Sequence, residues 1–192
     1  NNYNQLSILL TVEYIGISTI PVLLLIFVSR YAERDNWINT GRIFALFIIP
    51  FITFLKVLTN NSHHLFYKTS ELINTGRFSY HEFTKGPFYY VHLVYSHSVI
   101  IIAIYMIFIT YLKVSFENKI RVLFILISTL IPYIISISYI LGFTPEGNID
   151  LTPFGFLIMG LLLTIGTFNK GLLDIKPIVL NSIFKSIPDA IF

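Results

Sequence analysis

Histidines concentrate in one stretch of this 192-residue sequence, between two apolar segments. The five histidines are His63, His64, His81, His92 and His97. The first two follow one apolar segment, the last two lie near the start of the next, and His81 lies in the polar loop between them. An imidazole is not needed to anchor a protein in a bilayer, but it can ligate a metal ion or join a hydrogen-bonded cluster. We therefore expect the function to reside in residues 60–95.

The spacing of these histidines favours a polar cluster over a metal site. His92 and His97 are five residues apart, about 140° around a helix, so they do not share a face. A two-histidine metal motif on one helix uses a spacing of four. Tyr95 follows His92 by three residues and could share its face. His63 and His64 are adjacent and point apart, so we predict no metal site and keep His63, His64 and His92 only as weak candidate ligands.

Two ionisable residues lie inside apolar segments, where charge is costly and usually functional. Glu13 lies near the start of the first segment and Lys56 near the end of the second, at similar depth and with opposite sign. They could contact a ligand or form a structural ion pair, and Lys56 could also extend to the lipid headgroups. Gly16 is interpreted as a small residue that permits close helix packing.

Polar residues at helix ends complete the candidate site. Asn60 and Asn61 suit the C-terminal cap of the second segment. Asp150 or Thr152 suits the N-terminal cap of the fifth. We predict a polar cluster that packs the outer ends of the helices or lines a pocket there. Its candidate ligand-contacting residues are Glu13, Tyr14, Asn60, His63, His64, His92, Tyr95 and Asp150.

Several classes of function are excluded by what the sequence lacks. It contains no phosphate-binding loop, no G-x-S-x-G and no H-E-x-x-H motif. It contains no cysteine, which excludes disulfides, cysteine metal sites and thiol catalysis. The basic residues are spread over several loops and form no stripe that would bind nucleic acid. We predict no catalytic residue, no cofactor and no nucleic-acid partner for this chain.

The composition is that of an integral membrane protein. Only 12% of the residues are charged and 55% are hydrophobic, whereas about 25% are charged in a soluble domain. Five segments could each cross about 30 Å of hydrocarbon as helices, namely 6–28, 43–58, 87–112, 120–143 and 153–168. We therefore predict an all-α membrane protein, a bundle of five transmembrane helices over residues 1–170.

Prolines occur in or at the start of every predicted span. Pro87 and Pro153 suit the first turns of their helices. Pro21, Pro50 and Pro132 lie inside helices and are expected to kink them.

The loops give an orientation. Nine basic residues lie on the side that holds the C-terminus and three on the opposite side, with Lys56 counted in the membrane. The positive-inside rule then predicts a cytoplasmic C-terminus in a multi-pass protein of the plasma membrane. Residues 60–86 form an extracellular loop of about 27 residues, long enough to be functional or to fold against the bundle. Within it, residues 65–67 are interpreted as an interfacial aromatic anchor.

A helical apolar stripe, in which Val179, Ile183 and Ile187 are four residues apart, marks the region after the fifth span. We predict that residues 171–192 form a cytoplasmic linker helix that ends before Pro188. A helix lying on the membrane surface fits the pattern equally well.

Several short motifs, in this order, resemble a known family. They are Glu13-Tyr-Ile-Gly-Ile, Leu58-Thr-Asn with His63-His64, Val91-His-Leu-Val-Tyr-Ser, Ile149-Asp-Leu-Thr-Pro, Gly171-Leu-Leu-Asp-Ile and Ile187-Pro-Asp-Ala-Ile. Together the chain resembles the N-terminal seven-transmembrane sensor region of membrane histidine kinases. Lys56 departs from the pattern, since an apolar residue is expected there.

The resemblance implies more than these residues show. Two further helices are expected before Asn1, and a PAS domain or the kinase itself after Phe192, where all catalytic residues and the ATP site would lie. The parent protein would be a sensor histidine kinase, a homodimer whose partners are the lipid bilayer, a small-molecule or peptide ligand and a response regulator.

Three other functions compete with a sensor. A transporter or channel would need polar residues along the inner halves of the helices, which hold mainly Ser, Thr and Tyr and no charge. A membrane enzyme with a histidine-bound metal would contain stoichiometric metal. In a plain assembly subunit, the polar cluster would only fix the helix register.

Overall fold

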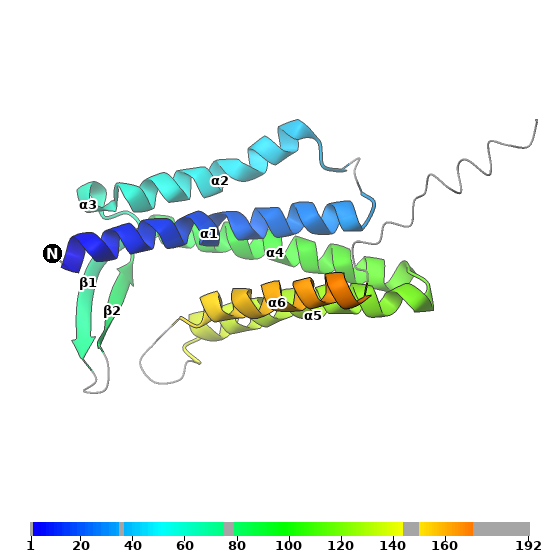
Figure 1. Cartoon of the computed structure of the whole chain (residues 1–192). Helices are drawn as coiled ribbons and strands as arrows, with labels where there is room; N and C mark the ends of the chain where they lie inside the picture. The colour runs from blue at the N-terminus through cyan, green and yellow to red at the C-terminus, as the bar shows by residue number, and fades with distance from the viewer. Residues whose placement is uncertain (1, 35–36, 75–78, 144–149, 171–192) are drawn as a thin grey trace, which may run out of the picture.

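The computed structural model describes residues 2–34, 37–74, 79–143 and 150–170. Its helices are α1 (Asn2–Tyr31), α2 (Thr40–Leu58), α3 (Asn60–His63), α4 (Pro87–Lys113), α5 (Phe116–Ile140) and α6 (Thr152–Lys170), and its strands are β1 (Tyr67–Asn74) and β2 (Ser79–Lys85). The long helices run along one bundle, with α3 and the two strands at the end where the chain begins (Figure 1). The predicted linker helix over residues 171–192 lies outside the described residues.

The predicted spans correspond to five of these helices. Four helices are long and apolar enough to cross a membrane, and they cover Ile8–Tyr31, Thr40–Leu58, Pro87–Lys113 and Asn118–Ile140. The apolar part of α6, Thr152–Gly166, is shorter. The structure therefore supports a helical membrane protein with four candidate spans, and the fifth predicted span is not established by length.

The prolines lie where the sequence predicts. Pro87 is in the first turn of α4, after the N-cap Gly86, and Pro153 is the second residue of α6. Pro21, Pro50 and Pro132 lie inside α1, α2 and α5. A proline is tolerated in the first turn because its missing N–H has no helical partner there.

Helix α4 connects the two parts of the bundle. Helix α1 packs against both α2 and α4, while α5 packs against α4 and, most extensively, against α6. Gly155 permits the close approach of α6 to α5, since a Cβ there would lie 2.8 Å from Pro132 Cα. Among the described residues, a Cβ at Gly16 would meet nothing within 4 Å, so the packing role expected for Gly16 is not supported within this chain and Gly155 has such a role.

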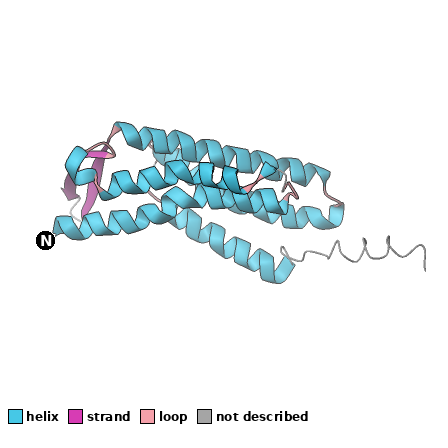
Figure 2. Ribbon diagram, turned by 90° about the horizontal axis from the view of Figure 1, so that it is seen from above, coloured by secondary structure: helices cyan, strands magenta, loops and turns pink. Residues whose placement is uncertain are grey.

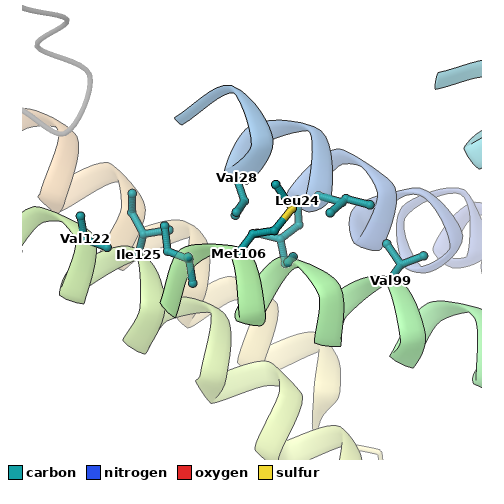
Figure 3. Packing of buried hydrophobic residues seen from close by; sticks show 9 residues of the cluster. Leu24, Val28, Val99, Met106, Val122 and Ile125 are labelled. Carbon is teal, nitrogen blue, oxygen red and sulfur yellow. The ribbon is translucent and has the colours of Figure 1, made fainter. Parts of the chain in front are cut away.

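The main hydrophobic core joins α1, α4 and α5 in the half of the bundle away from the strands (Figure 3). Its buried residues are Leu24, Leu25, Val28, Val99, Ala103, Met106, Ile107, Val122 and Ile125. Among the described residues, the buried polar side chains are His92 and the hydroxyls of serines and threonines. Several hydroxyls donate to carbonyls of their own helix, such as Thr129 Oγ1 to Ile125 O at 2.9 Å. In the described part of this core, the buried polar side chains are thus uncharged hydroxyl groups.

The loop between α2 and α4 contains an antiparallel hairpin that was not predicted from the sequence. The strands β1 and β2 pair from Tyr67 opposite Lys85 to Asn74 opposite Ser79, and Thr69 Oγ1 donates to Thr84 Oγ1 at 2.8 Å. The hairpin lies at the end of the helices (Figure 2). The all-α prediction fits the membrane bundle, and the hairpin is an addition outside the candidate spans, where its edges can meet water.

Candidate functional site

An aromatic cluster attaches the hairpin to the helices. Phe66, which precedes β1, is fully buried, and its ring meets the edge of Tyr14 at a centroid distance of 4.9 Å. The hydroxyls of Tyr14 and Tyr67 are 2.6 Å apart. Burial raises the pKa of the Tyr67 phenol, which keeps the proton needed for this bond. Residues 65–67 are therefore not simply an interfacial anchor as expected, because Phe66 is buried in a core with Tyr14 of α1 and Val57 of α2, against which Phe88 and Tyr89 of α4 pack.

The predicted histidine–tyrosine face of α4 points toward α2. His92 is buried, and its Nδ1 lies 3.3 Å from Thr53 Oγ1 of α2. Tyr95 donates its hydroxyl to the carbonyl of Leu46, also in α2. The two side chains thus share a face, as their spacing predicts. His97 contacts a different helix, since its Nε2 lies 3.5 Å from Ser136 Oγ of α5.

A cavity of about 90 Å³ lies among α1, α4, α5 and α6, near the hairpin end of the bundle. Three predicted site residues line it, namely Tyr14, His92 and Asp150. The other polar residues on its wall are Tyr89, Ser96, His97, Ser136, Tyr139 and Thr152. A water molecule occupies about 30 Å³ in the liquid, so the cavity accepts a few waters or a small chemical group.

Asp150 links this cavity to the start of α6. Its Oδ1 accepts the backbone N–H of Thr152, the first residue of α6, at 2.8 Å, which supports the predicted capping role. Its charge also acts on Glu13 of α1 and on Lys85 of β2. In the described part of the chain, Glu13 and Lys56 form no ion pair with each other, so that interpretation of the pair is not supported.

Lys85 was not among the predicted site residues. Its Nζ lies 4.5 Å from the ring centroid of Tyr139 and 5.1 Å from that of Tyr89. Burial lowers the pKa of its ammonium group, and the negative charge of Asp150 acts in the opposite direction. In the sequence, Lys85 counted only as a basic loop residue, and its position just before the start of α4 was the available clue.

The remaining predicted residues stabilise the turn before the hairpin. Thr59, rather than Asn60 or Asn61, is the C-cap of α2. Asn60 Oδ1 accepts the N–H groups of Phe66 and Tyr67, both at 3.0 Å. His63 Nδ1 accepts the N–H of Leu65 at 3.0 Å.

The two adjacent histidines do not belong to the cavity. Burial, followed by the positive charges of Lys56 and His64, lowers the pKa of His63 and favours the neutral ring that this acceptor role requires. His64 ends α3 in the left-handed conformation, with φ of 52°. No group of three or more His, Cys, Asp or Glu side chains suited to a metal ion occurs among the residues that were placed, and His63 and His64 are engaged apart from His92.

The fold and this site define a class of protein. The chain is a multi-pass helical membrane protein with a small cavity at one end of its bundle, lined by both polar and apolar side chains. Residues 1–177 match the family described as the N-terminal 7TM region of histidine kinase. Since the match covers most of the chain, the protein belongs to this family and is part of a histidine kinase sensor region. Comparisons with curated proteins and with solved structures gave no match.

Proposed function

We propose that this chain is the signal-sensing membrane region of a two-component sensor histidine kinase. One observation carries the proposal: the cavity borders the N-terminal end of α6, the last of the described helices. Asp150 and Thr152 line the cavity, and Thr152 is the first residue of α6, whose backbone N–H Asp150 accepts. A ligand or a change in the membrane that alters this cavity would therefore act directly on the helix that leads toward the kinase.

The proposed mechanism uses two packings of the helices. A signal shifts their populations only if it interacts differently with each, and a coupling of 1–3 kcal/mol corresponds to a change of about 5- to 150-fold. Pro21 borders the cavity, and Pro132 lies against Gly155 of α6. Because an internal proline weakens helical hydrogen bonding, these are suitable places for bending.

We further propose that α6 is the fifth span and that the C-terminus is cytoplasmic. The 19 residues of α6 would rise about 28 Å, close to the hydrocarbon thickness of about 30 Å. The parent kinase would bind ATP outside this region, act as a homodimer and transfer phosphate to a response regulator. Family membership supports the membrane context and the response regulator, while the ligand and the dimer are part of the proposal.

The proposal is tested in the full-length kinase, reconstituted in lipid vesicles with ATP and its response regulator. We expect His92→Gln and Asp150→Asn each to change the rate of phosphotransfer by about fivefold or more, because each alters the cavity wall. Asp150→Asn removes the charge but retains an oxygen that can cap α6.

Ser98→Ala is the matched control on α4. Its hydroxyl is exposed and donates only within its helix, to Val94 O, so we expect wild-type phosphotransfer. Wild-type rates in both correctly inserted cavity variants would contradict a sensing role for the cavity.

A further inference from the structure

The ammonium group of Lys85 is held in a cage made by three elements. The rings of Tyr89 on α4 and Tyr139 on α5 lie within 5.1 and 4.5 Å of its Nζ. The carboxylate of Asp150, just before α6, acts on the same group electrostatically. An ammonium within about 6 Å of a ring face is attracted by the ring quadrupole. Two aromatic faces and a carboxylate are the surroundings that select an organic cation.

The backbone that carries Lys85 is fixed, whereas its side chain can leave the cage. Gly86 donates its N–H to Phe66 O at 2.8 Å, and Phe88 donates to Leu65 O at 3.0 Å. The chain passes so close to Leu65 that a Cβ on Gly86 would lie 2.2 Å from its carbonyl oxygen. The side chain alone can therefore rotate out of the cage while the end of the hairpin keeps its place.

The cage lies near a second carboxylate. Asp150 acts on Glu13 as well as on Lys85. If Lys85 moved out, the cage would retain its negative potential and would attract another cation.

Tyr89, Tyr139 and Asp150 also help to line the cavity of about 90 Å³, whose lining does not include Lys85. Thr152 also lines it, and its Oγ1 is buried without a hydrogen-bond partner among the placed residues. A buried hydroxyl without a partner is costly and is usually satisfied by a water or a ligand. The space suits an ammonium group that carries a short alkyl chain.

We propose that Tyr89, Tyr139 and Asp150 form a binding site for small organic ammonium ions, which Lys85 occupies as a tethered competitor. Binding follows from the cage alone, whereas any effect of binding on the kinase rests on the proposed function. A tethered group competes with an effective concentration in the millimolar range. Removing the ammonium of Lys85 should therefore strengthen the binding of a free ammonium ion by at least about tenfold.

The test measures the binding of n-butylammonium to the full-length protein by calorimetry in nanodiscs of anionic lipid. We expect Lys85→Ala to bind at least about tenfold more tightly than the wild type. Lys85→Gln keeps most of the side-chain length without the charge and should also bind more tightly, which covers the case in which Lys85→Ala does not fold. Lys68→Ala, an exposed lysine of the same hairpin, is the matched control and should behave as the wild type.

A second substitution tests the cage itself. Lys85→Gln combined with Asp150→Asn should bind n-butylammonium no more tightly than the wild type, because the carboxylate of the cage is removed. If neither Lys85→Ala nor Lys85→Gln binds n-butylammonium better than Lys68→Ala, the cage is not a cation site. If the double variant still binds n-butylammonium more tightly than the wild type, Asp150 is not part of the site and the proposed set of residues is wrong.

The source of the ammonium group is distinguished by lipid composition. A headgroup such as ethanolamine and a soluble amine share the same chemistry. If the headgroup is the natural occupant, nanodiscs that contain phosphatidylethanolamine should weaken n-butylammonium binding to Lys85→Gln. If phosphatidylethanolamine leaves n-butylammonium binding unchanged, the natural occupant is a soluble amine. Both results are consistent with the proposed site.

Phosphotransfer measured in the same samples separates this inference from the proposed function. Binding without any change in phosphotransfer would retain the cage and contradict its role in signalling. If n-butylammonium does not bind but Asp150→Asn alters phosphotransfer, the proposed sensing function is supported and the proposed ammonium site is overturned.

Discussion

Asn60 shows how a residue assigned to ligand sensing can instead hold a turn together. Its Oδ1 accepts two backbone N–H groups, from Phe66 and Tyr67, and its Nδ2 donates to Tyr67 O at 2.9 Å. A side-chain amide offers two acceptor lone pairs and two donor hydrogens. Both lone pairs and one donor are therefore used inside the protein, which leaves little capacity for a ligand.

We expect Asn60→Ala to destabilise the protein by about 2–4 kcal/mol, because three hydrogen bonds are lost at about 0.5–1.5 kcal/mol each. Asn60→Asp retains both acceptor bonds and should cost less. The free energy of unfolding in detergent measures both effects.

Ser62→Ala is the control for this turn. It removes an exposed hydroxyl that donates to Thr59 O at 2.8 Å, and it should cost less than 1 kcal/mol, as surface changes usually do. If Asn60→Ala were as stable as Ser62→Ala, the turn would not depend on this amide.

The sequence indicated which residues are candidates for the site, but it did not indicate which residues they contact. The sequence singled out Tyr14, His92 and Asp150, and all three line one cavity. It also grouped His63 with them, although both nitrogens of that ring make local hydrogen bonds, to Leu65 N–H and to the Thr59 hydroxyl. Helical spacing relates residues on one helix, as for His92 and Tyr95, but it does not say which other helix they meet.

Among the elements, the helices were predictable and the hairpin was not. Long uncharged runs predict spanning helices, and the structure places α2 and α4 within three residues of the expected bounds. The strand β1, by contrast, reads Tyr-Lys-Thr-Ser-Glu-Leu-Ile-Asn, with little alternation of apolar and polar residues. It pairs with β2 through backbone bonds, and its attachment depends on Phe66 just outside it.

Helices α5 and α6 pack closely at Gly155, so a larger residue at this position should force them apart. We expect Gly155→Ala to destabilise the protein by about 1–3 kcal/mol, as overpacking does. The added methyl would lie 2.8 Å from Pro132 Cα and 3.1 Å from Ile135 Cδ1, so the two helices would have to separate. Thermal denaturation in detergent measures the loss.

Gly160→Ala is the matched control on α6. A Cβ there meets nothing within 4 Å, and alanine favours helix over glycine, so the variant should be as stable as the wild type or slightly more stable. Equal stability of the two variants would show that α5 and α6 do not pack closely at Gly155.

At the scale of the whole molecule, the site depends on the packing of helices that are far apart in sequence. Tyr14 of α1 meets Tyr67 across 53 residues, and His92 of α4 meets Thr53 across 39. The sequence predicted that polar groups would gather at the outer helix ends because the orientation of each span follows from loop charges. It could not predict the cavity, since neighbour choice depends on side-chain packing throughout the bundle.

The predicted orientation in the membrane can be tested by labelling introduced cysteines, because this chain contains no cysteine of its own. Single cysteines at Glu71 in β1 and at Asn118 in α5, both exposed, lie at opposite ends of the bundle. In intact cells, a membrane-impermeant maleimide should label Glu71→Cys, because the hairpin is predicted to be extracellular. Asn118→Cys should react only after the cells are permeabilised, and Ile101→Cys, half exposed in the middle of α4, should resist in both cases because lipid covers it. Labelling of Asn118→Cys but not Glu71→Cys in intact cells would invert the topology, and the cavity would then face the cytoplasm.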